Sequence, residues 1–182
     1  MTVALAVASS DGVVLASDSA STTRDSGGRT FVFHHKKKIF PLHDSLPIGV
    51  ATAGLNRLDG VSVSSLCVEL KKKLTEVENW KLDPKSYTLS DVADRLKDLI
   101  FVEHYLPLFE KLPADNRMTF YVAGYSAGEQ FPELIEIAFA GQHIVGPFRV
   151  AGKKHRPCEV HGSGRSNSPI DARLCSKAAC HP

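Results

Sequence analysis

The sequence lacks any long run of apolar residues. No run approaches the roughly 18 consecutive apolar residues that a membrane-spanning helix needs, so we expect no membrane span. The opening residues, MTVALAVASSDG, have no basic region and their apolar run ends at Ala8, which does not predict a signal peptide. Cysteine is scarce, with four among 182 residues. Without an export signal we expect a reducing cytoplasmic location and no disulfides.

The chain also lacks a strong net charge. The formal charge is +2, and a composition of 43% hydrophobic and 23% charged residues excludes disordered, collagen-like and coiled-coil proteins. The charge is nevertheless uneven. Residues 152–182 hold six of the 22 basic and two of the 20 acidic residues, which leaves 16 basic and 18 acidic residues in 1–151. We therefore expect a folded domain at 1–151 and a poorly ordered basic tail, containing Cys and His, at 152–182.

Apolar runs predict three pairs of strands. The first pair flanks Asp11-Gly12, and Asp-Gly between apolar runs is a strong hairpin signal. The small polar residues 19–30 predict a loop. The predicted strands are 3–7 with 13–16, 39–42 with 48–53, and 119–123 with 134–139.

Between the second and third pairs of predicted strands, the apolar residues recur at the spacing of a helix. One helix is predicted from about Val61 to Glu78, and a second is predicted to begin at Ser90 as its N-cap and to kink or end at Pro107. An order of strands, helices and strands favours an antiparallel sheet with helices packed on one face, which is an α+β fold.

Thr2 is the strongest candidate for a catalytic residue. It follows the initiator Met1, and removal of Met1 would leave Thr2 with a free α-amine. The residue would then contain both a hydroxyl nucleophile and a base able to take its proton. Because an α-amine has a pKa of about 7.7–8.0, a useful fraction of it is neutral at physiological pH.

An aspartate and a lysine are available to tune that amine. Asp18 ends the second predicted strand and Lys38 precedes the third, so both can converge on the N-terminus. A lysine cation would lower the pKa of the amine, and the aspartate would hold the lysine charged and in place. The same residues also have a purely structural interpretation, because an aspartate after a strand is commonly a turn former and a lysine run is commonly a solvated edge.

Three blocks of sequence resemble the family of proteasome β-subunits and bacterial HslV-type subunits, which are N-terminal nucleophile (Ntn) hydrolases. The blocks are TVALAVASSDGVVLASDSAST, KKIFPLHDSLPIGVATAGL and FYVAGYSAGEQFPELIEIAFAG. The separation between Thr2 and Asp18 matches the family, and Lys38 precedes an apolar strand as the family's catalytic lysine does. The resemblance implies an αββα sandwich, with two antiparallel sheets between helical layers.

The same resemblance implies a threonine-type endopeptidase. The hydroxyl of Thr2 would attack a peptide carbonyl, and Asp18 and Lys38 would tune it. The backbone N–H of Gly54 would bind the oxyanion. Ser163, which lies in a Gly-Ser-Gly motif, would support catalysis.

Three further residues are implied to bind substrate. The backbone of Thr22 would pair with an extended peptide, and Ser21 and Thr52 would line the pocket for the side chain before the cut. Both are small and polar, so no sharp preference is expected. The implied partners are a peptide or unfolded protein, other copies of the chain in a ring, and an ATP-dependent unfoldase. No metal, cofactor, nucleic acid or membrane is expected.

The sequence departs from the family pattern in three places, the first being Asp18-Ser19-Ala20, which lacks the arginine common in the family after Asp-Ser. The segment 24–38 is a few residues longer than usual, so Lys36 and Lys37 stay open as alternatives to Lys38. After Phe148 the apolar patterning stops, where the family continues with further helices and strands. We therefore expect a C-terminal part that is truncated or divergent.

Other functions remain open. The chain would be a non-catalytic ring subunit if Met1 were retained, and an Ntn amidohydrolase acting on a small amide is a further alternative. A zinc site in the tail is not favoured, because only Cys175 and Cys180 have a knuckle-like spacing. A nucleic-acid surface is not favoured either, because we find no aromatic residues interleaved with the basic ones.

Overall fold

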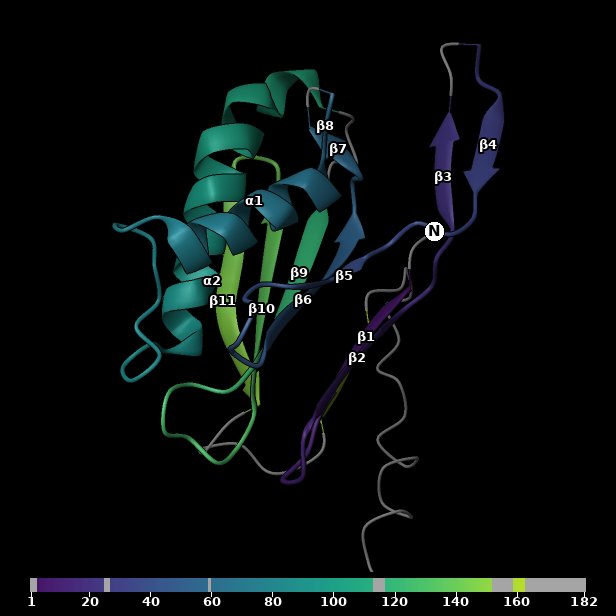
Figure 1. Cartoon of the computed structure of the whole chain (residues 1–182). Helices are drawn as coiled ribbons and strands as arrows, with labels where there is room; N and C mark the ends of the chain where they lie inside the picture. Colours follow the sequence, from purple (N-terminus) through teal and green to yellow (C-terminus); the bar gives the residue numbers. More distant parts are fainter. Residues whose placement is uncertain (1–2, 25–26, 59, 113–116, 152–158, 163–182) are drawn as a thin grey trace, which may run out of the picture.

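The computed structural model describes residues 3–24, 27–58, 60–112, 117–151 and 159–162. Within these residues the chain forms three layers (Figure 1): helices, a five-stranded sheet and a three-stranded sheet. The five-stranded sheet is antiparallel throughout, in the order β11-β10-β9-β6-β5. Its strands are β5 (Ile39–Pro41), β6 (Ile48–Gly54), β9 (Met118–Gly124), β10 (Glu133–Ala140) and β11 (His143–Ala151).

The strands predicted at 39–42, 48–53, 119–123 and 134–139 are confirmed, but β11 was not predicted. Its sequence contains Gly146-Pro147, which reads as a turn, and its pairing with β10 shifts register between Glu136 and Ala138. An irregular strand of this kind has no clean period-2 pattern, because the bulge interrupts the alternation.

The three-stranded sheet has the order β12-β1-β2 and lies on the opposite face of the five-stranded sheet from the helices (Figure 1). Its strands are β1 (Ala4–Ala8), β2 (Val13–Ser17) and β12 (Glu159–Gly162). The hairpin predicted around Asp11-Gly12 is confirmed, since β1 and β2 pair antiparallel. β12 lies within the segment predicted to be a poorly ordered tail, and the boundary after residue 151 stays a prediction.

Small side chains of β1 face the five-stranded sheet. Ala4, Ala6 and Ala8 of β1 are almost fully buried, and they pack in one cluster with Ala51 and Ala53 of β6. Alternate residues of a strand point to the same face, so β1 presents a row of methyl groups to the larger sheet. The larger Tyr121 and Leu134 of the five-stranded sheet are buried in the same cluster.

The prediction of a loop at 19–30 is wrong. β3 (Ser21–Arg24) pairs antiparallel with β4 (Thr30–Phe33), and this hairpin projects away from the three layers (Figure 1). The polar residues of β3 do not predict a strand, but backbone pairing requires no apolar side chains. A second short hairpin, β7 (Arg57–Leu58) with β8 (Val61–Ser62), occupies the predicted start of the first helix.

Two helices begin at capping side chains. In α1 (Val63–Glu76), Ser62 Oγ accepts a hydrogen bond from the N–H of Ser65 at 3.0 Å. In α2 (Leu89–Leu96), the cap is Thr88 rather than the predicted Ser90. Thr88 and Asp91 form a capping box in which each side chain bonds the other's backbone N–H. The sequence prediction overlooked Thr88 because Ser90 is also a preferred cap residue.

The second helix changes type before Pro107. α2 continues as a π-helix, η1 (Lys97–Tyr105), and then as a 3₁₀-helix, η2 (Leu106–Lys111). Pro107 lies in the first turn of η2, where its missing N–H is tolerated. The predicted disruption at Pro107 is therefore a change of helix type.

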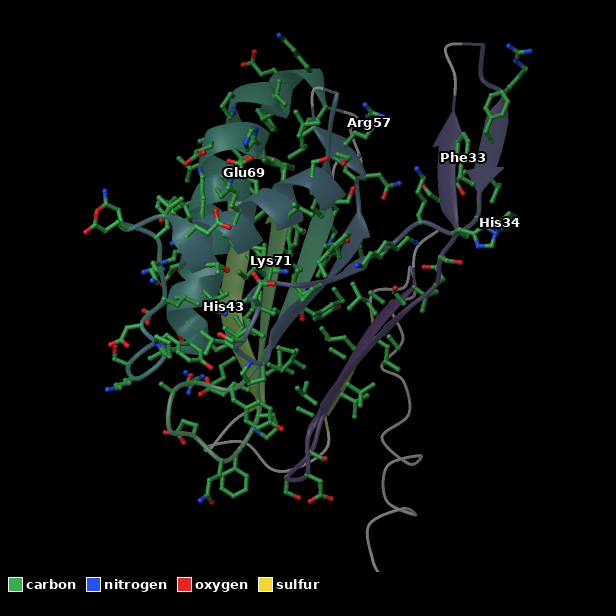
Figure 2. All side chains as sticks on the ribbon, viewed as in Figure 1. Phe33, His34, His43, Arg57, Glu69 and Lys71 are labelled. Carbon is green, nitrogen blue, oxygen red and sulfur yellow. The ribbon has the colours of Figure 1, made fainter. Side chains whose placement is uncertain are left out.

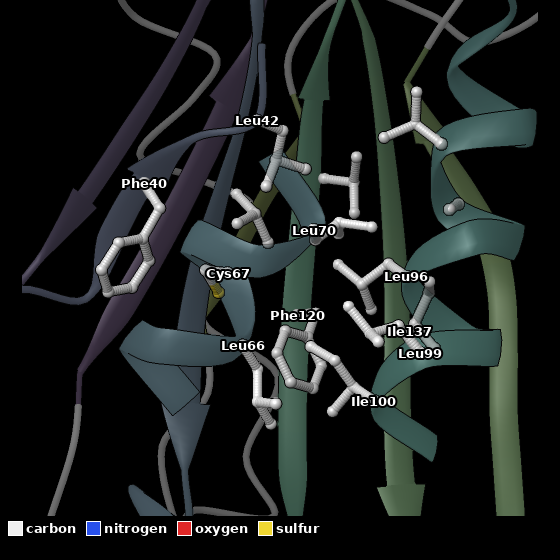
Figure 3. Close-up of a cluster of buried hydrophobic side chains, with 14 of the residues drawn as sticks. Phe40, Leu42, Leu66, Cys67, Leu70, Leu96, Leu99, Ile100, Phe120 and Ile137 are labelled. Atoms are coloured by element: carbon white, nitrogen blue, oxygen red, sulfur yellow. The ribbon is translucent and has the colours of Figure 1, made fainter. Parts of the chain in front are cut away.

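The main core lies between the helices and the five-stranded sheet (Figure 3). Leu66, Cys67 and Leu70 of α1 are fully buried there, together with Leu96 of α2 and Phe120 of β9. Burial raises the pKa of the Cys67 thiol to about 12, so this thiol stays protonated and acts as a packing group.

The α+β class is confirmed, but the expected αββα sandwich is present only in part. Within the described residues, helices cover one face of the five-stranded sheet and the three-stranded sheet covers the other. We find no second helical layer in this part of the chain. None of the described helices is long and apolar enough to cross a membrane.

The core predicts the cost of truncating α1. Leu70→Ala should lower the free energy of unfolding by about 2–5 kcal/mol, because Leu70 is fully buried and its removal leaves a cavity. Val68→Ala is the matched control on the same helix, since Val68 is 61% exposed, and it should change stability by about 0.5 kcal/mol or less. Urea unfolding of both variants checks this. Equal losses would contradict the described packing of α1.

Candidate active site

Asp18 lies where the β1–β2 hairpin opens. Its carboxylate accepts a hydrogen bond from the N–H of Val3 through Oδ1 at 3.0 Å, and its own N–H donates to the carbonyl of Val3 at 3.1 Å. These bonds continue the ladder one pair beyond Ala4 and Ser17. The ladder therefore fixes the Asp18 carboxylate beside the residue that follows Thr2 in the sequence.

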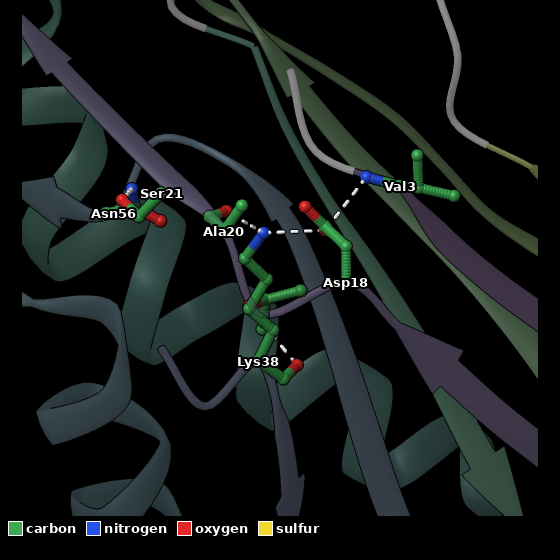
Figure 4. A network of polar contacts seen from close by, with 7 residues as sticks. Val3, Asp18, Ala20, Ser21, Lys38 and Asn56 are labelled. Carbon is green, nitrogen blue, oxygen red and sulfur yellow. Dashed lines mark hydrogen bonds and ion pairs between the residues drawn. The ribbon is translucent and has the colours of Figure 1, made fainter. Parts of the chain in front are cut away.

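Lys38 reaches the same carboxylate from the other sheet (Figure 4). Its ammonium donates to Asp18 Oδ1 at 2.8 Å and to the carbonyl of Ala20 at 2.6 Å. The lysine side chain is 4% exposed. Its backbone carbonyl accepts the N–H of Thr52 at 2.8 Å, which extends the β5–β6 ladder and fixes the position from which the side chain starts.

The environment keeps the Asp18 carboxyl ionised. Partial burial on its own raises the pKa of the Asp18 carboxyl. Hydrogen bonds from Lys38 and from the N–H of Val3, with the charge of Lys38, outweigh that effect and hold the pKa below its usual value of 3.8. A nearly buried ammonium against an ionised carboxylate is a fixed charge arrangement that can act on a neighbouring titratable group.

Lys38, and not its neighbours, contacts Asp18. Lys36 and Lys37 are exposed, and their ammonium groups lie over the rings of Phe33 and Phe40, each at 5.7 Å. This geometry favours Lys38 among the three lysines that the sequence left open.

The predicted pocket residues flank this pair. Ser21, at the start of β3, is 4% exposed, and Thr52 on β6 is also buried, with Oγ1 donating to the carbonyl of Lys38 at 3.4 Å. Thr22 is exposed on β3 and pairs with Val32.

Asn56 belongs to the site, and sequence reasoning missed it. Its side-chain amide donates to Ser21 Oγ at 2.5 Å (Figure 4). This bond joins the loop that follows β6 to the start of β3. Ser21 directly follows Ala20, whose carbonyl binds Lys38. A lone asparagine in a loop carries no pattern, and only the fold brings it to a residue 35 positions away.

Gly54 ends β6 in a conformation that requires glycine. Its φ is +101°, and a Cβ at this position would lie 2.0 Å from the carbonyl oxygen of Arg117. The close approach of the two backbones explains why a residue without a side chain is found here. Its proposed role as an oxyanion donor stays a prediction.

Two predicted catalytic residues, Thr2 and Ser163, lie outside the described residues, as do Cys158, Cys175 and Cys180 of the tail. The structure thus brings together Asp18, Lys38, Ser21 and Thr52.

The structure defines the class as an α+β fold with two facing antiparallel sheets. No family model matches the sequence, and no curated protein matches it. Among solved structures, the chain is similar to a chain from the helical assembly of the Anbu complex of Pseudomonas aeruginosa, with a TM-score of 0.52 and 19% sequence identity. The match covers 91% of this chain and 61% of the other, so this chain spans less than two thirds of its structural neighbour.

The assignment to the HslV-like and proteasome β-subunit family is therefore wrong. The Anbu complex is a proteasome-like family distinct from HslV. The blocks that carried the resemblance describe a strand hairpin followed by an aspartate, and a lysine before a strand. Because such features follow from a shared fold, they do not separate one family of that fold from another.

The ion pair predicts a pH-dependent contribution to stability. Lys38→Met should lower the free energy of unfolding by about 1–3 kcal/mol near pH 7, because it leaves a partly buried carboxylate without its cation. Since the folded pKa of Asp18 is lowered, the contribution is present above the unfolded pKa and is lost as the pH falls through the folded pKa. Urea unfolding of the wild type and of Lys38→Met, from pH 7 down to below the usual carboxyl pKa of 3.8, measures the effect.

Lys37→Met is the matched control for that experiment, because its ammonium does not contact Asp18. We expect a small change in stability without the acid dependence. A pH-independent loss in Lys38→Met, equal to that of the control, would contradict a stabilising pair.

Proposed function

We propose that the chain is a subunit of a proteasome-like assembly and a threonine-type peptidase, with Thr2 as nucleophile after removal of Met1. One observation carries this proposal. The Asp18 carboxylate binds the Lys38 ammonium and the N–H of Val3, the residue that directly follows Thr2. The Lys38 cation is thus held by a carboxylate that also binds the residue next to a potential α-amine and hydroxyl.

The proposed chemistry is acyl transfer. Thr2 Oγ1 attacks the scissile carbonyl carbon, and the hydroxyl proton passes to the α-amine of Thr2 and then to the leaving amine as the C–N bond breaks. Water then hydrolyses the ester and regenerates the hydroxyl. The Lys38 cation lowers the pKa of the α-amine and so keeps more of it neutral as a base.

Other residues have supporting roles in this proposal. The N–H of Gly54 stabilises the tetrahedral oxyanion, and Ser163 assists near the nucleophile. The exposed backbone of Thr22 on β3 pairs with an extended peptide, while Ser21 and Thr52 border the pocket for the side chain before the cut. The finer architecture in this proposal is the Ntn sandwich.

The assembly is proposed from the fold. The structural neighbour comes from a helical assembly, and a chain of similar fold is expected to associate with further copies of itself. We extend the proposal to a cytoplasmic location, to an ATP-dependent unfoldase as partner, and to a domain boundary after residue 151.

The peptidase proposal predicts a defined N-terminus. The intact mass of the purified chain should lack one methionine residue, because the α-amine of Thr2 must be free to act as base. Thr2→Ala should abolish cleavage of short fluorogenic peptides, whereas Thr2→Ser, the matched control, retains the hydroxyl and should retain measurable cleavage. A retained Met1, or cleavage that survives in Thr2→Ala, would refute the nucleophile and leave a non-catalytic subunit.

A further inference from the structure

The β3–β4 hairpin presents apolar side chains to solvent. Phe31, Val32 and Phe33 of β4 are 46%, 52% and 48% exposed, and Figure 2 shows Phe33 on the hairpin, away from the three layers. Phe31 and Phe33 are two residues apart on one strand and so share a face. An isolated two-stranded ribbon is marginally stable in water. A protruding ribbon with three exposed apolar residues therefore has the character of a docking element.

The hairpin segment differs in charge from the rest of the domain. Residues 27–37 contain three basic residues and no acidic one. The remaining residues of 1–151 contain 13 basic and 18 acidic residues, a net charge of −5. The basic segment is therefore opposite in charge to the rest of residues 1–151 in another copy of the chain, and charge complementarity of this kind selects partners and orientation.

An open surface pocket lies apart from the β3–β4 hairpin. It has a volume of about 210 Å³ and lies between the β7–β8 hairpin and the junction of η1 and η2. It is lined by Leu58, Val61, Glu103, His104, Pro107 and Leu108. This volume exceeds the roughly 150 Å³ of an enclosed apolar cavity that accepts benzene, so a phenyl ring fits in it by size, although the pocket is open to solvent and its lining is both apolar and polar. Glu103 supplies an acidic group that is 47% exposed and also pairs with Lys73 at 3.6 Å.

We propose that the hairpin of one copy docks on a second copy of the chain, with Phe33 entering the Glu103 cavity. Lys36 accompanies Phe33, since its ammonium lies over the Phe33 ring at 5.7 Å, and it pairs with Glu103 of the second copy. The inference rests on the proposed role as an assembly subunit and adds the surfaces that join the copies. Because the two surfaces are different parts of the chain, the contact can repeat from copy to copy and build a ring or a helix.

Exchanging the charges of Lys36 and Glu103 tests the docking. Lys36→Glu and Glu103→Lys should each weaken self-association roughly tenfold, because each places like charges together, and the double variant should restore it. Phe33→Ala should weaken it by roughly thirtyfold or more, as loss of a buried aromatic anchor does. Sedimentation equilibrium of the full chain measures association, and far-ultraviolet circular dichroism checks the fold. Lys81→Glu, on an exposed lysine elsewhere, is the matched control and should leave association unchanged.

The outcomes separate this inference from the peptidase proposal. Association that depends on Phe33 and is rescued by the double variant supports the docking, even if the chain cleaves no peptide. A monomeric wild-type chain, or two charge variants whose effects simply add, would overturn the docking even if cleavage is found. A monomer that binds labelled oligothymidylate through Lys36 would also overturn it and assign the hairpin to single-stranded nucleic acid.

Discussion

The ion pair between Lys38 and Asp18 is the interaction on which the candidate site depends. It joins the five-stranded sheet, where Lys38 precedes β5, to the end of the three-stranded sheet, where Asp18 follows β2. Each partner is held by a strand ladder that extends one pair beyond its strand. The pair is thus a product of two hairpins, and neither hairpin alone would create it.

Apolar packing joins the same two sheets as the ion pair. Ala4 and Ala6 of β1 form one buried cluster with Ala53 of β6 and with larger side chains of the five-stranded sheet, Tyr121 and Leu134. The sheets are therefore held together by a buried apolar cluster and by the Lys38–Asp18 contact.

Sequence reasoning could find the parts of the site that have a pattern. Asp18 and Lys38 stand at the ends of apolar strand runs, which made their convergence predictable. Asn56 was missed because a loop amide has no periodic signal and depends on a contact distant in sequence, and the β3–β4 pairing was missed because the strand β3 is polar. The family was misassigned because hairpins and strand-end charges belong to the fold, and several families share it.

The central proposal is that the Lys38 cation lowers the pKa of the α-amine of Thr2. The most direct measurement is an NMR titration of that amine in the chain lacking Met1, with and without the Lys38→Met substitution. The account predicts a pKa below the ordinary value of about 7.7–8.0 in the wild type, which returns to that range when the cation is removed. An ordinary pKa in both chains would contradict the account, because the lysine would then have no influence on the proposed base.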